Sequence, residues 1–261
     1  MQLGGNIMKK KKIIITAGPT NERIDAVMKI TNMSTGALGA TIADEFLEEE
    51  QLQKLYYLSP KLAKKPTTKN DKIILVTIES AIDLLKALKQ ILTTDTIDTV
   101  IHSAAVGDYY GEYAITGEQL AKEIAEIVAE EKPNEEELEK LILKIIEHPK
   151  MKTSNHHKIS SYQPNLMIKL GLTPKVIHSI KKIAPNVQLI GFKLLDGVTK
   201  EELINVAEHL KETNQANYIV ANDLSNIGNG KHQAYIIGNN GIEAECQTKK
   251  EIAKELRKRI F

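Results

Sequence analysis

The segment ITNMSTGALG, residues 30–39, combines residue types that suit phosphate binding. It follows the strand-and-turn pattern KKIIITAGPTNER and leads directly into a helical pattern. Asn32 is followed by Ser34, Thr35 and Gly36, which are typical of a helix N-cap. Backbone N–H groups and the positive end of a helix dipole then meet at one place, an arrangement that binds anions. The segment therefore predicts a phosphate site.

Asn32 permits two interpretations. By residue type, an asparagine in a turn usually hydrogen-bonds its own backbone. Beside a phosphate-binding helix start, however, a neutral amide donor suits a carboxylate that is being converted to an acyl phosphate, because charge develops on the carbonyl and phosphoryl oxygens. We therefore treat Asn32 as a candidate catalytic residue.

A second polar loop, HSAAVGDYY at 102–110, follows another apolar strand and carries Asp108. This acid is either an ordinary turn residue or, near a polyphosphate, a ligand for Mg²⁺. Together the two loops predict a phosphate-bearing ligand that lies across the carboxyl ends of a parallel sheet, with a metal-compatible carboxylate nearby.

Short apolar runs alternate with longer amphipathic runs along the chain. The strand candidates are rich in β-branched residues and nearly continuously apolar, as expected of strands covered on both faces. They are 11–17, 54–58, 72–78, 98–104, 187–193, 217–221 and 234–238. Helical patterns occupy 36–49, 80–92, 118–131, 135–147, 173–183, 199–213 and 248–259. This alternation predicts a doubly wound, mainly parallel α/β sheet with helices on both faces.

Residues 111–165 interrupt this alternation with a Glu/Lys-rich stretch and the loop HPKMKTSNHHKISSYQPN. The simpler interpretation is a solvated insertion. The alternative is a flap in which Lys158, Ser160 and Ser161 close over a ligand. We expect one α/β domain over 9–261 that contains this insertion and flap, preceded by an N-terminal extension at 1–8. Near the end of the chain, Asn-Gly at 240–241 predicts a hairpin, and Thr248 predicts a helix cap.

Composition argues against several classes of function. The net charge is +1 and tryptophan is absent, so neither a global field nor stacking platforms for nucleic acid are expected. No apolar run approaches the roughly 20 residues that span a bilayer. The basic start MQLGGNIMKKKK lacks the apolar core of a signal peptide. Cys246 is the only cysteine, which fits a reducing cytoplasm.

Familiar nucleotide and zinc motifs are absent from the sequence. The first turn has no GxGxxG, because Gly18 is followed by Pro19, and no acid follows the second strand to bind a ribose hydroxyl. No GxxxxGK[ST] loop occurs. The pair His156-His157 lacks the spacing of zinc ligands.

Several blocks together resemble phosphopantothenate–cysteine ligase, in the stand-alone form without a fused decarboxylase. The blocks are ITAGPTNERID, ITNMSTGALG, HSAAVGDYY, HHKISS, LTPKVI, LIGFKLL and YIVANDL, spread between about 10 and 258. The resemblance implies a homodimeric, Rossmann-like, cytoplasmic enzyme of coenzyme A synthesis. Such enzymes condense 4′-phosphopantothenate with L-cysteine through an acyl-nucleotidylate. The nucleotide is generally CTP in bacterial members and ATP in eukaryotic ones, and this bacterial-looking chain favours CTP.

The resemblance also implies roles for particular residues. Asn32 would help to form and stabilise the acyl-nucleotide. Lys158, the first residue of the flap motif, would serve the cysteine step, and Asp108 would contact nucleotide and Mg²⁺. The remaining candidate binding residues are Gly18, Thr20, Ser34, Thr35, Gly36, Ala104, Ala105, Ser160, Phe192, Lys193 and Asn222.

Three departures from the family pattern concern basic residues. The flap K-x-K-K is KISS at 158–161, Met28 stands where the family has arginine, and Ala37 stands where it has lysine. These losses would lower phosphate affinity or transfer it to groups such as Arg23 or Lys193. They also support a second hypothesis, a non-catalytic binding or regulatory relative with the same fold. A Rossmann oxidoreductase has the least support.

Overall fold

The structure is a computed structural model that describes residues 10–153 and 158–261. His156 and His157 therefore lie outside the described residues. The chain divides into two compact units. Unit 1 comprises residues up to Thr20, Asn32–Val106 and Pro174–Phe261, and unit 2 comprises Asn21–Thr31 and Gly107–Thr173. Unit 2 thus takes in more of the chain than the insertion expected at 111–165.

Unit 1 is built on one eight-stranded sheet with the order β14-β13-β10-β9-β6-β1-β4-β5. Its strands are β1 (Lys11–Thr16), β4 (Leu52–Ser59), β5 (Ile73–Thr77), β6 (Thr99–His102), β9 (Gln188–Leu195), β10 (Tyr218–Asp223), β13 (Ala234–Gly238) and β14 (Gly241–Cys246). All neighbours from β10 to β5 are parallel, whereas β13 pairs antiparallel with both β10 and β14. The predicted doubly wound, mainly parallel sheet is confirmed.

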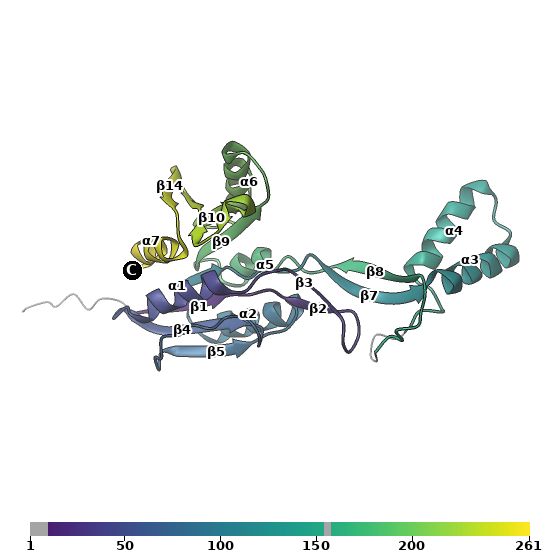
Figure 1. The fold of residues 1–261 in the computed structure, drawn as a ribbon, viewed down its shortest axis with the longest axis horizontal. Helices are drawn as coiled ribbons and strands as arrows, with labels where there is room; N and C mark the ends of the chain where they lie inside the picture. Colours follow the sequence, from purple (N-terminus) through teal and green to yellow (C-terminus); the bar gives the residue numbers. More distant parts are fainter. Residues whose placement is uncertain (1–9, 154–157) are drawn as a thin grey trace, which may run out of the picture. The chain divides into compact units, whose positions relative to one another are not determined.

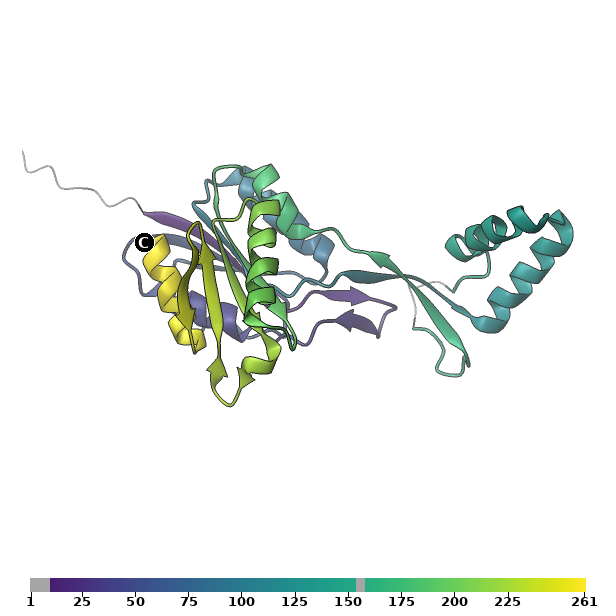
Figure 2. The same ribbon diagram turned by 90° about the horizontal axis from the view of Figure 1, so that it is seen from above.

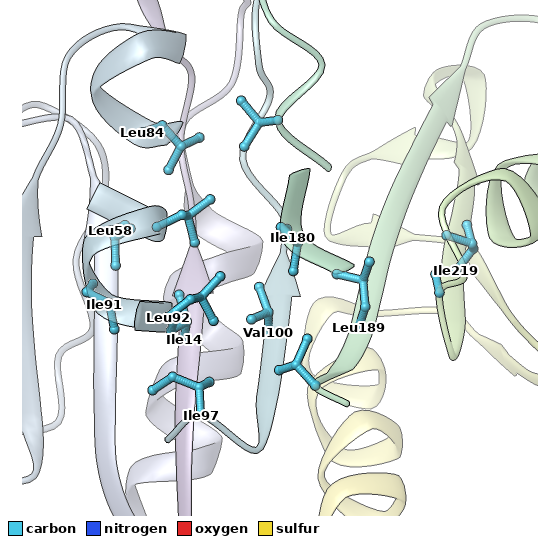
Figure 3. Close-up of a cluster of buried hydrophobic side chains, with 14 of the residues drawn as sticks. Ile14, Leu58, Leu84, Ile91, Leu92, Ile97, Val100, Ile180, Leu189 and Ile219 are labelled. Atoms are coloured by element: carbon cyan, nitrogen blue, oxygen red, sulfur yellow. The ribbon is translucent and has the colours of Figure 1, made fainter. Parts of the chain in front are cut away.

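Helices cover both faces of this sheet (Figure 1). One face carries α1 (Ala37–Leu47) and α7 (Lys249–Ile260), and the other carries α2 (Ala81–Thr94), α5 (Val176–Ile183) and α6 (Lys200–Thr213). Strand β1 shows why both faces are apolar. Its residues point alternately to opposite faces, so Ile13 and Ile15 join the core beneath α1 and α7 while Ile14 joins the other core (Figure 3).

The ends of the helices follow local sequence rules. Ser80 and Asp83 form a reciprocal capping box at the start of α2, and Thr248 accepts the Glu251 N–H at the start of α7, as predicted. The predicted C-terminal hairpin is also present, with Gly241 at φ 78° next to the turn. Between β10 and β13 lie the 3₁₀ turn η1 (Leu224–Asn226) and the short pair β11 (Ile227–Gly228) and β12 (Lys231–His232).

Unit 2 contains two antiparallel strand pairs and a helical hairpin. Strand β2 (Asn21–Arg23) pairs with β3 (Lys29–Thr31), and β7 (Tyr109–Thr116) pairs with β8 (Leu166–Leu172). Helices α3 (Gly117–Glu131) and α4 (Glu135–Glu147) follow β7, as Figure 2 shows in teal. A small core of Tyr113, Ile115, Leu120 and Ile145 joins β7 to both helices. The two helices were predicted, but the four strands of this unit were missed.

None of the described helices has both the length and the apolar character needed to cross a membrane.

The core between α2 and the sheet gives a direct test of packing in unit 1. Leu84 of α2 is completely buried (Figure 3), whereas Ile82 of the same helix is 48% exposed. We expect Leu84→Ala to lower the free energy of unfolding by about 2–5 kcal/mol, because it removes buried methyl groups and leaves a cavity. Urea denaturation measures the change. The control Ile82→Ala is expected to cost well under half as much, and equal losses would contradict this packing.

Candidate functional site

The carboxyl ends of β1 and β6 mark the point at which the order of the sheet reverses. Strands β4 and β5 lie on one side of β1, and β6, β9 and β10 lie on the other. In open α/β sheets, ligands bind outside the carboxyl ends of the strands at such a switch point. The segments that follow β1, β6, β9 and β10 carry predicted binding residues. They therefore emerge at the same end of the sheet, where the parallel strands have their carboxyl ends.

Two of these segments are joined by backbone hydrogen bonds. The Ala105 N–H donates to the Gly18 carbonyl at 2.9 Å, and the Thr20 N–H donates to the Ala105 carbonyl at 3.1 Å. Pro19 and Ala105 form a parallel bridge between these bonds. The pairing of β1 with β6 thus continues into the loops. This pairing brings together four candidate binding residues that come from two separate segments: Gly18, Thr20, Ala104 and Ala105.

Asn32 attaches to the same loop. Its amide Nδ2 donates to the carbonyls of Ala105 and Val106 at 3.3 and 3.2 Å. Its own carbonyl accepts the Ser34 N–H at 2.8 Å. Asn32 is exposed, so its side chain lies at the surface of this edge. Both amide protons are directed at main-chain oxygens here, and the proposed role toward an acyl group stays a prediction.

The start of α1 differs from the sequence-based expectation. The N-cap is Gly36, in the left-handed region at φ 76°, and no side chain caps the helix. Thr35 Oγ1 accepts only the Ala37 N–H, at 3.3 Å. The N-cap is thus the last residue of the predicted Ser34-Thr35-Gly36 segment, and neither hydroxyl caps the helix. A Cβ on Gly36 would lie 3.2 Å from the Cα and N of Gly18, so the close approach of two backbones requires glycine. The helix start keeps the uncapped N–H groups that bind anions.

A lysine-bearing loop, residues 60–65, packs against these two glycines. A Cβ on Gly18 would meet the Ala63 Cβ at 2.6 Å, and the Lys64 N–H donates to the Thr35 carbonyl at 2.9 Å. The ammonium of Lys65 donates to Ser59 Oγ and the Pro60 carbonyl, and burial lowers the pKa of Lys65. The positive charge of this loop was missed. The basic run KLAKK directly after a strand was the available signal.

A buried polar pair supports the loop after β6. Thr16 Oγ1 lies 2.9 Å from Nδ1 of His102 and accepts the Ala104 N–H at 3.2 Å. Burial lowers the pKa of His102 to about 4, so the imidazole is neutral at physiological pH. The sequence analysis included His102 in the loop motif but gave it no role.

Strands β9 and β10 bring their predicted residues to the same edge of the sheet. Phe192 packs partly into the core beneath α1 and α7, Lys193 pairs in register with Ala221, and Asn222 is 7% exposed. The neighbouring Asp223 accepts backbone N–H groups from Gly197, Val198 and Ser225 at 2.8–3.0 Å. These bonds, led by that from the Ser225 hydroxyl, lower the pKa of Asp223 to about 2. A fixed negative charge therefore orders the loops that follow both strands.

The other predicted site residues belong to unit 2. Asp108 is exposed and precedes β7, and its carbonyl accepts the Thr173 N–H at 3.0 Å. Lys158 and Ser160 are exposed in the segment that leads to β8, and Ser160 Oγ accepts the Tyr162 N–H at 3.3 Å. Within the described ranges, no three His, Cys, Asp or Glu side chains gather to hold a metal ion.

The order of the sheet, with its loops gathered at the switch point, defines a doubly wound, Rossmann-like α/β protein. The chain belongs to the family of the DNA/pantothenate metabolism flavoprotein C-terminal domain, whose model matches residues 8–144 and 148–261.

Curated relatives carry the name coenzyme A biosynthesis bifunctional protein CoaBC. The chain is 27% identical to that of Thermococcus kodakarensis, over 95% of this chain and 50% of the relative. It is 26% identical to that of Methanocaldococcus jannaschii, over 99% of this chain and 53% of the relative. The chain therefore spans about half the length of the curated relatives it matches.

Solved structures share the fold. A DNA/pantothenate metabolism flavoprotein from Streptococcus pneumoniae has a TM-score of 0.78 and 33% identity, covering 96% of this chain and 98% of that chain. The C-terminal domain of a CoaBC has a TM-score of 0.65 and 26% identity, with coverage of 98% and 96%. A Cab2 mutant in complex with phosphopantothenate-cysteine has a TM-score of 0.65 at 15% identity, covering 95% and 86%, and shows the fold alone.

The neutral, buried His102 predicts a pH dependence of stability. An unfolded histidine has a pKa of about 6.5, whereas that of His102 is lowered to about 4. Between these values only the unfolded chain binds this proton, so the free energy of unfolding falls as pH decreases from about 6.5 to about 4. The full shift corresponds to about 3 kcal/mol.

Urea denaturation across this pH range tests the effect. His102→Gln is expected to show a shallower slope than the parent chain. Part of the slope remains, since burial also lowers the pKa of His232 to about 4. The control is His209→Gln, at an exposed position on α6, which should keep the parent slope. An unchanged slope in His102→Gln would refute the assignment.

Proposed function

We propose that this protein is a ligase of coenzyme A biosynthesis that condenses 4′-phosphopantothenate with L-cysteine. The observation that carries the proposal is the joining of the β1 and β6 loops at the switch point, beside an uncapped helix start. That edge combines backbone donors, an amide side chain and a nearby lysine, which are the groups needed for a phosphate and an activated carboxyl group. Membership of the flavoprotein C-terminal domain family and the names of the CoaBC relatives support it.

The chemistry requires two steps because a carboxylate does not react directly with an amine. In the first, a carboxylate oxygen of phosphopantothenate attacks the α-phosphorus of a nucleoside triphosphate, and pyrophosphate leaves. In the second, the cysteine nitrogen attacks the acyl carbon, the nucleoside monophosphate leaves, and the nitrogen loses a proton. The products are the amide, pyrophosphate and nucleoside monophosphate.

In this proposal, residues of unit 1 serve the first step. The N–H groups at the start of α1 and the Lys65 loop bind phosphate oxygens. Asn32 exchanges one of its two long hydrogen bonds to the 105–106 carbonyls for an oxygen of the acyl-nucleotide. A preorganised donor of this kind stabilises the charge that develops in the transition state. Phe192, within β9, and Asn222, near the end of β10, border the nucleotide.

The nucleotide would be accompanied by Mg²⁺, and CTP is the proposed co-substrate in preference to ATP. Mg²⁺ usually retains several waters and is held by one or two carboxylates together with phosphate oxygens. A single exposed carboxylate such as Asp108 fits that mode better than a closed cage of protein ligands. Bound there, Mg²⁺ would neutralise charge on the triphosphate. Lys158 of unit 2 is assigned to the cysteine step, and Ser160 to nucleotide or substrate binding.

A homodimer is proposed from the apolar strand pair of unit 2. The register of β7 and β8 places Tyr109 opposite Leu172, and Leu170 lies two residues further along the same face. These side chains are 50%, 72% and 44% exposed. A cluster of exposed large apolar residues typically marks an interaction surface, and a second copy of this chain is the proposed partner. The buried Cys246 agrees with a cytoplasmic location.

A pyrophosphate-release assay with 4′-phosphopantothenate and Mg²⁺ tests the function. With cysteine, we expect pyrophosphate and nucleoside monophosphate to form in equal amounts, faster with CTP than with ATP. Without cysteine, a single turnover should leave a trapped acyl-nucleotide. Binding of substrates without any pyrophosphate from either nucleotide would instead support the non-catalytic relative.

Asn32→Ala tests the first step. Loss of one preorganised donor lowers rates by about 10²–10³-fold in comparable sites, so the burst of pyrophosphate should slow to that extent. The matched control is Asn240→Ala, an exposed asparagine of the β13–β14 turn, which should retain the parent rate. A normal burst in Asn32→Ala would remove Asn32 from the proposed mechanism.

A further inference from the structure

The turn between β2 and β3 is organised by one buried carboxylate. Asp25 is 2% exposed, and its Oδ1 accepts the N–H groups of Val27 and Met28, both at 2.6 Å. Such a bond pattern from an aspartate to the residues that follow it is a common way to close a turn. The first oxygen of Asp25 is therefore explained by local structure.

The second oxygen of Asp25 has a long-range partner. Oδ2 accepts the N–H of Ile159 at 2.9 Å, from a segment 134 residues further along the chain. Ile159 is itself 4% exposed. Three backbone donors thus converge on one carboxylate, and these bonds, led by that from Met28, lower the pKa of Asp25. The positive charge of Lys158 contributes in the same direction. Asp25 is consequently ionised at neutral pH.

The hydrogen bond from Ile159 to Asp25 fixes the backbone position from which the Lys158 side chain extends. Ile159, the residue directly after Lys158, donates its N–H to Asp25, and its side chain is buried. Lys158 itself is exposed, so its ammonium extends from a fixed backbone position. A long lysine side chain has many rotamers, and anchoring its backbone limits the volume that the ammonium can reach.

We propose that Asp25 is a positioning residue that places Lys158 for the amide-forming step. The inference rests on the proposed function, which assigns Lys158 to that step. A carboxylate suits the task because its two oxygens serve the turn and Ile159 separately. An asparagine offers only one acceptor oxygen and would direct an NH₂ group at a backbone N–H. Asp25→Asn therefore removes either the hydrogen bonds to Val27 and Met28 in the turn or the hydrogen bond to Ile159.

The test measures the two half-reactions separately in the full chain. Acyl-nucleotide formation is followed by the pyrophosphate burst without cysteine, and amide formation by cysteine-dependent release of nucleoside monophosphate. Asp25→Asn is expected to slow amide formation by about 10–100-fold, the effect of a misplaced catalytic group, and to leave the burst within about threefold of the parent. Lys158→Gln should show the same selective defect. Combining the two substitutions should add little, because both act through one group.

Glu123→Gln provides the matched control within unit 2. Glu123 is also a buried carboxylate, 3% exposed, that accepts backbone N–H groups from Lys150 and Met151 at 2.7 and 3.0 Å. Its replacement should lower the midpoint of thermal unfolding without changing the ratio of the two half-reactions. If Asp25→Asn does not fold, Asp25→Glu keeps both oxygens but displaces them, and should show a smaller loss of the same selectivity.

The results of these assays distinguish a failure of the proposed function from a failure of the positioning role of Asp25. No acyl-nucleotide in the parent chain would refute the function itself. A selective defect in Lys158→Gln, combined with an Asp25 variant that behaves like Glu123→Gln, would refute only the positioning role. Equal losses in both half-reactions for the Asp25 variants would refute it as well.

Discussion

The candidate site depends on the hydrogen bonds that join the ends of β1 and β6. Neighbouring parallel strands usually separate at a switch point, where the two chains leave in opposite directions. Here the ladder continues through Gly18, Thr20 and Ala105 before the loops diverge. That continuation gives Asn32 two carbonyls to bind and gives Gly36 a backbone to pack against. The sheet from which these loops start is buried on both faces. The first residues of the loops are therefore held in place by a packed core, as a preorganised site requires.

Buried polar groups serve a common purpose in both units. Asp223 holds the loops after β9 and β10, Asp25 holds the β2–β3 turn and residue 159, and Glu123 holds the segment after α4. In each case a carboxylate accepts backbone N–H groups that have no partner in a helix or strand. A buried donor without an acceptor destabilises the fold, so these acids both satisfy the loops and fix their shape. The neutral Thr16–His102 pair does the same for the loop after β6 without adding charge to the core.

Both units carry candidate residues for the proposed reaction. Most groups assigned to nucleotide activation lie in unit 1, near the carboxyl ends of central strands and at the start of α1, whereas Asp108, the proposed Mg²⁺ ligand, lies in unit 2. Lys158, which is assigned to the cysteine step, and Ser160, a candidate binding residue, also lie in unit 2. An activated acyl group must be protected from water before the amine arrives. In the proposed reaction, Lys158 of unit 2 serves the step that consumes this intermediate.

Local sequence patterns determined the strands of the central sheet, the helices that cover it and the two helices of unit 2, because apolar periodicity reports which faces are buried. They also brought the 30–39 and 102–110 loops to one sheet edge, since parallel strands end together. The short pair β11 and β12 of unit 1 was not predicted. Tertiary structure alone decided the left-handed Gly36 cap, which follows from its contact with Gly18, a residue distant in sequence. It likewise decided the β2–β3 and β7–β8 pairs and the bond from Asp25 to Ile159. Strands β2 and β3 have three residues each, which is too short for a periodic signal, and β7 pairs with β8 across two intervening helices, so these pairings become visible only when the chain is folded.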